Sequence, residues 1–288
     1  NRIKFPVEIV RNIREACGEN FILIYRLSML DLIEDGSTKE EVVLLGKEIE
    51  KAGASIINTG IGWHEARIPT IATMVPKGGF AWVTEAIRKE LTIPLITTNR
   101  INDPQTAESI LAKGQADMIS MARPFLADAE IVKKAKENRA DEINICIACN
   151  QACLDHVFKQ KRATCLVNPR ACYETELKAE PVSTVKNIAV VVGGMAGMSY
   201  ALEALKRGHK VAIFEKGNEV GGQFKLASKI PGKDDFKDSI AYFKHMLNKH
   251  DVEWHMGVEV TVDTLQKYDE VIIASGVKPR KVLIPGIE

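Results

Sequence analysis

The first 140 residues alternate between short apolar runs and longer segments with helical periodicity. Apolar runs that contain few polar residues are typical of strands buried on both faces, and they predict strands at residues 21–27, 55–59, 95–98 and 118–121. The intervening segments predict helices at residues 5–16, 82–90 and 128–138, with further helices that begin at a Ser37–Glu40 capping box and at an Asp103-Pro104 cap. This alternation predicts a parallel sheet in an α/β domain.

The pattern contains four strand–helix units in about 140 residues. This is half of a (β/α)8 TIM barrel, for which about 250 residues are typical. An open, doubly wound sheet is the alternative. The glycine-rich turn that usually follows its first strand is missing, because Arg26-Leu27-Ser28 occupies that place. The pattern therefore favours the C-terminal half of a barrel, which would expose sheet edges if it stood alone.

A second α/β pattern follows residues 175–185, which lack periodicity and predict a linker. Strands are expected at residues 188–192 and 210–214, with a helix at residues 196–207 between them. The turn from Val192 to Gly197 resembles G-x-G-x-x-G, and Glu215 ends the second strand about 20 positions later. This spacing predicts a dinucleotide-binding fold. Val192 replaces the first glycine, so we expect either a strained turn or a displaced pyrophosphate, with weaker pyrophosphate binding.

Composition narrows the function classes. The 288 residues contain 39 Lys and Arg against 38 Asp and Glu, which gives a net charge of +1. The basic residues form no stripe along the sequence that would indicate nucleic-acid binding. No apolar run reaches the roughly 18 residues that span a bilayer, so no membrane partner is expected. The N-terminus has no secretion signal, which predicts a cytoplasmic protein. The chain does not begin with Met, and we interpret it as an internal fragment.

Four of the six cysteines gather within twenty residues, as Cys146-x2-Cys149-x3-Cys153-x11-Cys165. In a chain without a secretion signal, this spacing indicates a metal site more than disulfides. Structural zinc usually takes two separated Cys-x2-Cys pairs. Closely gathered thiolates suit a 4Fe-4S cluster, which we expect here with zinc as the alternative. Cys17 and Cys172 lie outside the pattern and are expected to be structural.

Polar residues follow the predicted barrel strands, where barrel sites are built. Arg26, Arg100 and Arg123 predict a multiply anionic ligand such as a phosphorylated cofactor, because a guanidinium at a strand end needs a partner. The alternative is a set of Arg–carboxylate pairs that tie loops together. The loop beyond the second strand contains His64, a candidate hydrogen-bond donor or proton relay to substrate.

Several motifs together resemble one family, the old yellow enzyme-like iron–sulfur flavoproteins. Those motifs are Tyr25-Arg26-Leu27-Ser28, Gly62-Trp63-His64-Glu65-Ala66-Arg67, Asn99-Arg100-Ile101, Met121-Ala122-Arg123-Pro124-Phe125, the four cysteines, Gly221-Gly222-Gln223 and Ala274-Ser275-Gly276. The resemblance is to the NADPH-dependent 2,4-dienoyl-CoA reductase branch, which is related to trimethylamine dehydrogenase. It covers essentially the whole chain in order.

The resemblance implies an order of segments along the chain and a residue set for each cofactor. The second half of an FMN-binding barrel would span residues 1–140, the 4Fe-4S segment 141–174, a linker 175–186, and the first part of a Rossmann-like FAD domain 187–288. Arg26 would lie against the flavin ring, and Arg100, Ala122 and Arg123 would hold the phosphate side of FMN. The candidates for FAD are Gly194, Ala196, Glu215, Lys216, Gln223, Val260, Ala274 and Gly276. The candidate substrate residues are His64, Glu65, Ala66 and Arg67.

The implied activity is reduction of a 2,4-dienoyl-CoA to an enoyl-CoA in the β-oxidation of unsaturated fatty acids. Electrons would pass from NADPH to FAD, the 4Fe-4S cluster, FMN and then the substrate. His64 would assist a catalytic tyrosine that lies upstream of this chain, and the nicotinamide site would lie beyond its other end. The alternatives are an amine dehydrogenase or enone reductase of the same flavoprotein group, or a non-catalytic electron-transfer module. The oligomeric state is not predicted.

Overall fold

The computed structural model describes residues 2–63, 66–278, 280 and 283–286. The chain divides into two compact units. The first is Asn1–Tyr173 with Pro231–Asp235, and the second is Glu174–Ile230 with Phe236–Glu288. No sequence pattern predicts that residues 231–235 join the first unit.

The sheet of the first unit is parallel and its strands follow chain order. Among the described residues it consists of β1 (Ile24–Leu30), β2 (Ile56–Ile61), β3 (Leu95–Thr97) and β4 (Met118–Ile119). Consecutive strands of a (β/α) barrel lie in this order, whereas a doubly wound sheet reverses its order at a switch point. The strand order therefore supports the barrel interpretation.

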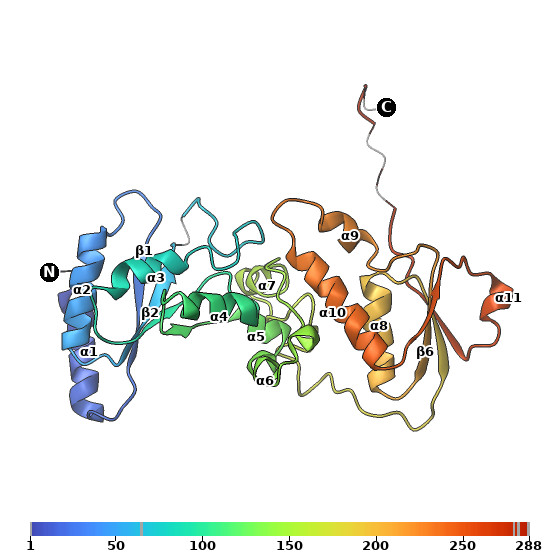
Figure 1. Ribbon diagram of the computed structural model, residues 1–288, viewed down its shortest axis with the longest axis horizontal. Helices are drawn as coiled ribbons and strands as arrows, with labels where there is room; N and C mark the ends of the chain where they lie inside the picture. The colour runs from blue at the N-terminus through green and yellow to red at the C-terminus, as the bar shows by residue number, and fades with distance from the viewer. Residues whose placement is uncertain (1, 64–65, 279, 281–282, 287–288) are drawn as a thin grey trace. The chain divides into compact units, whose positions relative to one another are not determined.

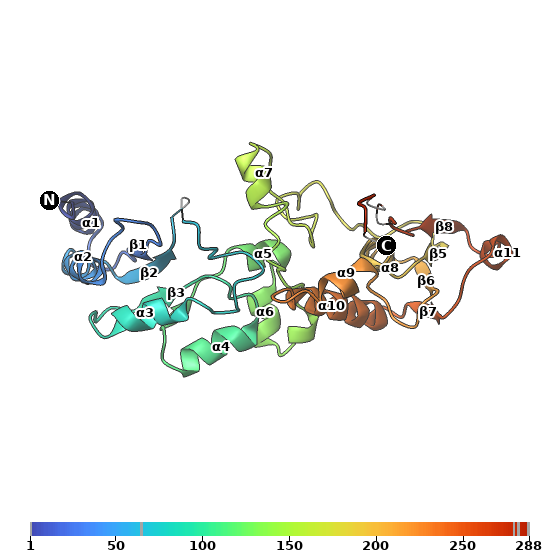
Figure 2. The same ribbon diagram turned by 90° about the horizontal axis from the view of Figure 1, so that it is seen from above.

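The helices of this unit follow the strands (Figures 1 and 2), and most of them begin near the predicted residue. They are α1 (Lys4–Cys17), α2 (Lys39–Lys51), α3 (Ala81–Arg88), α4 (Pro104–Ala112), α5 (Arg123–Ala127), α6 (Ile131–Lys136), the 3-10 turn Ala140–Glu142 and α7 (Leu154–Phe158). Asp103 caps α4 as predicted, because its side chain accepts a hydrogen bond from the Thr106 N–H. The capping box of α2 is Thr38–Glu41, so the Ser37–Glu40 prediction is wrong by one residue.

Two further boundaries differ from the sequence prediction. β1 begins at Ile24, not at residue 21, because its pairing with β2 starts at the Ile24–Ile56 register. Arg26 therefore lies inside β1 and not at its end. The helix expected at residues 128–138 is present as the shorter α6, which begins after the buried Asp128; this carboxylate accepts the Asn144 N–H and pairs with Lys134.

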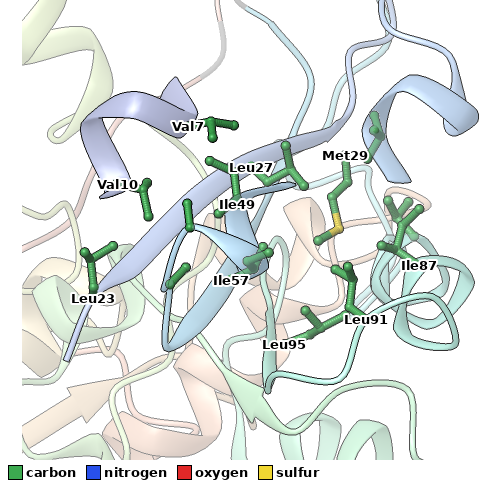
Figure 3. Close-up of a cluster of buried hydrophobic side chains, with 14 of the residues drawn as sticks. Val7, Val10, Leu23, Leu27, Met29, Ile49, Ile57, Ile87, Leu91 and Leu95 are labelled. Atoms are coloured by element: carbon green, nitrogen blue, oxygen red, sulfur yellow. The ribbon is translucent and has the colours of Figure 1, made fainter. Parts of the chain in front are cut away.

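The core of the first unit lies on one face of this sheet (Figure 3). Side chains that alternate along the strands, such as Leu27, Ile57 and Leu95, pack against apolar residues of α1, α2 and α3. Because successive strand residues point to opposite faces, Arg26 and Asn58 lie on the other face, side by side in register. In a barrel, the face away from the helices is the interior.

The second unit contains another parallel sheet, with the order β7-β6-β5-β8 in the described residues. Its strands are β5 (Asn187–Val191), β6 (Lys210–Glu215), β7 (Glu253–Met256) and β8 (Glu270–Ile273). Helices α8 (Met195–Lys206) and α10 (Asp235–Lys249) lie side by side (Figure 1) and share one apolar cluster with β5 and β6. The short helices are α9 (Gln223–Ala227) and α11 (Val262–Leu265). The order reverses beside β5, which is the switch point where doubly wound sheets bind ligands.

A buried ion pair holds residues 231–235 in the first unit. Arg100 Nη2 lies 2.7 Å from Asp235 Oδ2, and the two side chains are 4% and 1% exposed. Asn102 donates to the other carboxylate oxygen at 3.0 Å, and Lys77 lies 3.2 Å from it. Arg100 Nε also donates to the Val75 carbonyl. A carboxylate this deeply buried is tolerated only with such partners.

Replacing Asp235 with Asn should destabilise the protein by about 3–5 kcal/mol, because it leaves the buried Arg100 guanidinium without its counter-charge. Urea unfolding of the D235N variant measures the change. The matched control is Glu90→Gln, which breaks the exposed Lys47–Glu90 pair and should leave the unfolding midpoint nearly unchanged. Equal midpoints for D235N and the unaltered protein would show that the buried pair contributes no net stability.

Candidate functional site

The four cysteines of the predicted cluster line one pocket. Cys146 is buried, and Cys149, Cys153 and Cys165 are partly buried. The chain bends sharply around Cys149, since Ala148 and Asn150 both have positive φ angles, 51° and 61°. Cys153 precedes α7 directly, and Cys165 comes from the bridge that it forms with Asn168. Residues 146–153 therefore wrap three thiols around the pocket, and the fourth comes from a separate segment.

The surroundings of these thiols suit bound thiolates. Burial raises the pKa of Cys146 and of Cys149, and it raises the pKa of Cys165 to about 11. Backbone N–H groups point at the sulfurs and act in the opposite direction: Ala148 donates to Cys146 and Val167 to Cys165. A bound metal supplies the positive charge that deprotonates such thiols.

This donor set fits a group held by four thiolates. Backbone N–H groups that donate to the sulfurs are among the features that tune iron–sulfur clusters. The same thiols would also satisfy a tetrahedral zinc ion. The 4Fe-4S cluster thus stays a prediction, on residues that the structure brings together.

Arg26 and Asn58 form a polar pair of positions on the interior face of the first sheet. Arg26 is exposed and makes no ion pair or hydrogen bond within the described part of the chain. Asn58 Oδ1 is buried and has no hydrogen-bond partner among the described residues. A buried carbonyl oxygen without a donor is costly. A ring with N–H and carbonyl groups, such as a flavin, would match both residues, so this face fits the predicted FMN.

The other two predicted arginines have protein partners. Arg100 is bound to Asp235, which is the Arg–carboxylate alternative raised by the sequence. Its contact with the FMN phosphate stays a prediction. Arg123 begins α5, lines the cysteine pocket, and donates from Nη1 to Asn150 Oδ1 at 2.6 Å. Ala122, just before it, is exposed.

The predicted substrate loop is attached to the strand ends. Trp63 is half exposed, and the Ala66 N–H donates to the Trp63 carbonyl at 3.1 Å. Arg67 is exposed. His64 and Glu65 lie outside the described residues, so their roles stay predictions.

The glycine-rich turn of the second unit has an open side. A Cβ on Gly194 would meet no atom within 4 Å, and no side chain caps the first N–H groups of α8. The N-terminus of a helix with open space beside it fits a pyrophosphate. Gly197 is required for packing, because its Cβ would lie 2.2 Å from the Val192 carbonyl oxygen.

Most of the FAD candidates gather around this turn. Glu215 is buried and accepts the N–H groups of Gly193 and Gly217 with its two carboxylate oxygens. Gly222, next to Gln223, lies against Gly194, and Ala274 lies near Gly197. The remaining candidates are Ala196, Lys216 and Gly276, which are exposed, and Val260, which packs against the cluster containing Phe214.

Two family models match the chain, one in each half. Residues 1–142 match the NADH:flavin oxidoreductase / NADH oxidase family, and residues 186–288 match the pyridine nucleotide-disulphide oxidoreductases. The first part of the chain is therefore of the FMN type, and the second is of the FAD and NAD(P) type.

The relatives of the chain carry different activities in their names. It is 38% identical to a metal reductase of Desulforamulus reducens over 99% of the chain, and 39% identical to an NADH oxidase of Thermoanaerobacter brockii over 100% of the chain. It covers 43% and 45% of those proteins, so it spans less than half their length. A solved complex of 2-naphthoyl-CoA reductase with 2-naphthoyl-CoA shares 34% identity and a TM-score of 0.95 over 99% of this chain and 44% of that one.

Two residues near the sites, Asp31 and Asn150, were not singled out from the sequence. Asp31 accepts a hydrogen bond from Trp63 at the strand ends, and Asn150 accepts one from Arg123. A carboxylate directly after a strand of a barrel is a signal that points to Asp31. No local pattern predicts the partner of Arg123.

No helix in the described part of the chain is long and apolar enough to cross a bilayer.

Val192→Gly should raise the stability of the protein by about 1 kcal/mol. Val192 has a φ of 84°, which confirms the predicted strain, and a branched residue in this conformation costs about 1–3 kcal/mol. Glycine removes this strain but adds freedom to the unfolded chain, which offsets part of the gain. Thermal unfolding of the V192G variant measures the difference.

The matched control is Val191→Gly, at the neighbouring position inside β5. Val191 pairs with Phe214 and Ile273 in a regular strand, so glycine there should lower the unfolding midpoint. A lower midpoint for V192G as well would show that the left-handed turn carries no strain that glycine relieves.

Proposed function

We propose that this chain is part of a reductase of 2,4-dienoyl-CoA thioesters that uses NADPH, FAD, a 4Fe-4S cluster and FMN. The observation that carries the proposal is the four-thiol pocket, which is also lined by Arg123 of α5, the helix that follows β4. An iron–sulfur cluster at this place suits a flavin that receives its electrons singly. The coarser conclusion, a flavin-dependent oxidoreductase, comes from the family itself.

The residues that would hold each group are those described above. Arg26 and Asn58 would bind the FMN ring, Arg123 its phosphate side, and the four cysteines the cluster. The turn at Gly194 and the carboxylate of Glu215 would bind FAD. When bound, the flavins supply hydride transfer and the cluster supplies single-electron transfer.

A CoA thioester is the substrate class with the most support. The solved relative at 34% identity holds 2-naphthoyl-CoA, a conjugated acyl thioester. Arg67, exposed beyond β2, would attract the anionic phosphates of CoA. His64 in the same loop would assist the proton donor, so that a proton reaches the reduced acyl chain.

Replacing His64 with Asn should lower turnover of a 2,4-dienoyl-CoA by about 10²- to 10⁴-fold, the usual contribution of general acid–base catalysis. NADPH-dependent reduction of an artificial dye by the same holoenzyme serves as the internal control, because it requires electron entry but no substrate protonation. Normal dienoyl-CoA turnover in the H64N variant would remove His64 from the reaction. Dye reduction by an unaltered enzyme that turns over no acyl-CoA would favour the electron-transfer module.

Cys153→Ser should abolish the cluster, measured as loss of about four irons and four acid-labile sulfides per chain. The matched control is Cys172→Ser, because Cys172 does not line the thiol pocket in the described structure. That variant should retain its iron and its visible absorption. Zinc in place of iron in the unaltered protein, purified without oxygen, would refute the proposed electron path.

A further inference from the structure

Asp31 is a buried carboxylate at the C-terminal end of β1, and neither the core nor the cofactor candidates account for it. It is 3% exposed. Its Oδ1 accepts hydrogen bonds from Ser28 Oγ at 2.5 Å and from Trp63 Nε1 at 2.8 Å, and its Oδ2 accepts the Ser37 N–H at 2.8 Å. Ser28 lies on the same strand face as Arg26, so Asp31 is linked to the interior face of the sheet.

Asp31 remains ionised in this environment. Burial by itself raises the pKa of Asp31, but the hydrogen bonds from Ser28, Ser37 and Trp63 outweigh burial and hold the pKa below its usual value. Within the described residues the carboxylate pairs with no cation. Its negative charge therefore strengthens the hydrogen bonds from these donors. The Trp63 indole is the donor that comes from the end of a different strand, β2.

Trp63 is attached to the end of β1 by its backbone as well. The Gly62 N–H donates to the Leu30 carbonyl at 2.7 Å, and the Trp63 N–H donates to the Asp31 carbonyl at 3.1 Å. Gly62 has a φ of 70°, and a Cβ there would lie 2.9 Å from a Thr70 methyl group. The chain beyond β2 is thus fixed to the chain beyond β1 at both main-chain and side-chain level.

The indole is oriented against the usual preference of a surface tryptophan. Such a residue normally keeps its polar N–H toward water and packs its ring. Trp63 does the opposite: its N–H is bonded to a buried carboxylate, while the residue is 51% exposed. Ile68, further along the same loop, is 55% exposed. The strand ends of a barrel, where these apolar groups lie, are where substrates bind.

We propose that Asp31 is a positioning residue of the reduction site, and that the Trp63 indole it holds is the apolar wall for the conjugated acyl group of the thioester. The proposal rests on the proposed function, from which it takes the substrate class. A flat, electron-rich ring suits a planar conjugated chain, and the exposed cation Arg67 in the same loop suits the anionic CoA. Asp31 acts through Trp63 and makes no contact with substrate.

The test is a double-mutant cycle in the holoenzyme with Asp31→Asn, Trp63→Phe and both together. 2,4-Decadienoyl-CoA is the probe, and KM and kcat are measured separately. Each single change should raise KM about tenfold, with a smaller change in kcat, since Asp31→Asn makes the acceptor of the indole neutral and Trp63→Phe removes the donor. The double variant should be no worse than either single one, because both act through the same bond.

Indole fluorescence gives a readout that a purely structural role would not change. The thioester should quench the emission of the unaltered enzyme and of Trp82→Phe, a half-exposed tryptophan on α3, and this quenching should be absent in Trp63→Phe. Trp82→Phe should also leave KM unchanged. If Asp31→Asn does not fold, Trp63→Phe and the fluorescence still decide the proposal.

Additive effects in the cycle, or quenching that persists in Trp63→Phe, would overturn the proposal. Failure of the unaltered enzyme to reduce the dienoyl-CoA would instead overturn the proposed function. The cycle is then repeated with 2-cyclohexenone, an enone without CoA. Non-additive KM effects on cyclohexenone would uphold Asp31 and Trp63 for a different acceptor, and no turnover of either compound would overturn both proposals.

Discussion

The parallel register between β1 and β2 is the constraint on which the first unit depends. It sets Arg26 beside Asn58 and Leu27 beside Thr59. Because side chains alternate, a slip of one residue would turn Arg26 into the helix-covered core and Leu27 onto the interior face. Packing of the apolar face against α1, α2 and α3 excludes that slip. The same packing that stabilises the domain therefore also fixes the polar face where the FMN ring is predicted to bind.

Buried carboxylates connect parts of the chain that packing alone leaves separate. Asp235 is neutralised by the Arg100 guanidinium, 135 positions away along the chain. Glu215 is held by backbone N–H groups of the glycine-rich turn, and Asp31 by hydroxyl, indole and backbone donors. In each case the free-energy cost of burying the charge is offset only when the partner segment lies close enough to bind the carboxylate. These bonds thus fix loops at the edges of the sheets, where the candidate sites lie.

Elements with local signals could be predicted from the sequence. The Asp103 cap, the parallel strands and the gathering of four cysteines all follow from patterns between residues that are near one another along the chain. The start of β1 was wrong because the apolar run 21–27 gives no information on register, which is fixed by pairing with β2. The partner of Arg100 was missed for the same reason: no local pattern connects it with residue 235. Prediction of the flavin family succeeded because several short motifs had to agree in order along the whole chain.

Arg123 shows how one side chain serves two neighbouring parts of the first unit. It follows β4 closely, where a barrel holds phosphate, and it also lines the thiol pocket. Its charge lowers the pKa of the Cys146 and Cys149 thiols against the larger effect of burial. A guanidinium has five N–H donors, and the bond to Asn150 uses one of them, so a phosphate contact and a thiolate neighbour are compatible. Lysine carries a single point charge on a flexible side chain, so it could not face a phosphate and the thiolates in fixed directions at once. The strand end and the cysteine segment are therefore joined by the geometry of one planar cation.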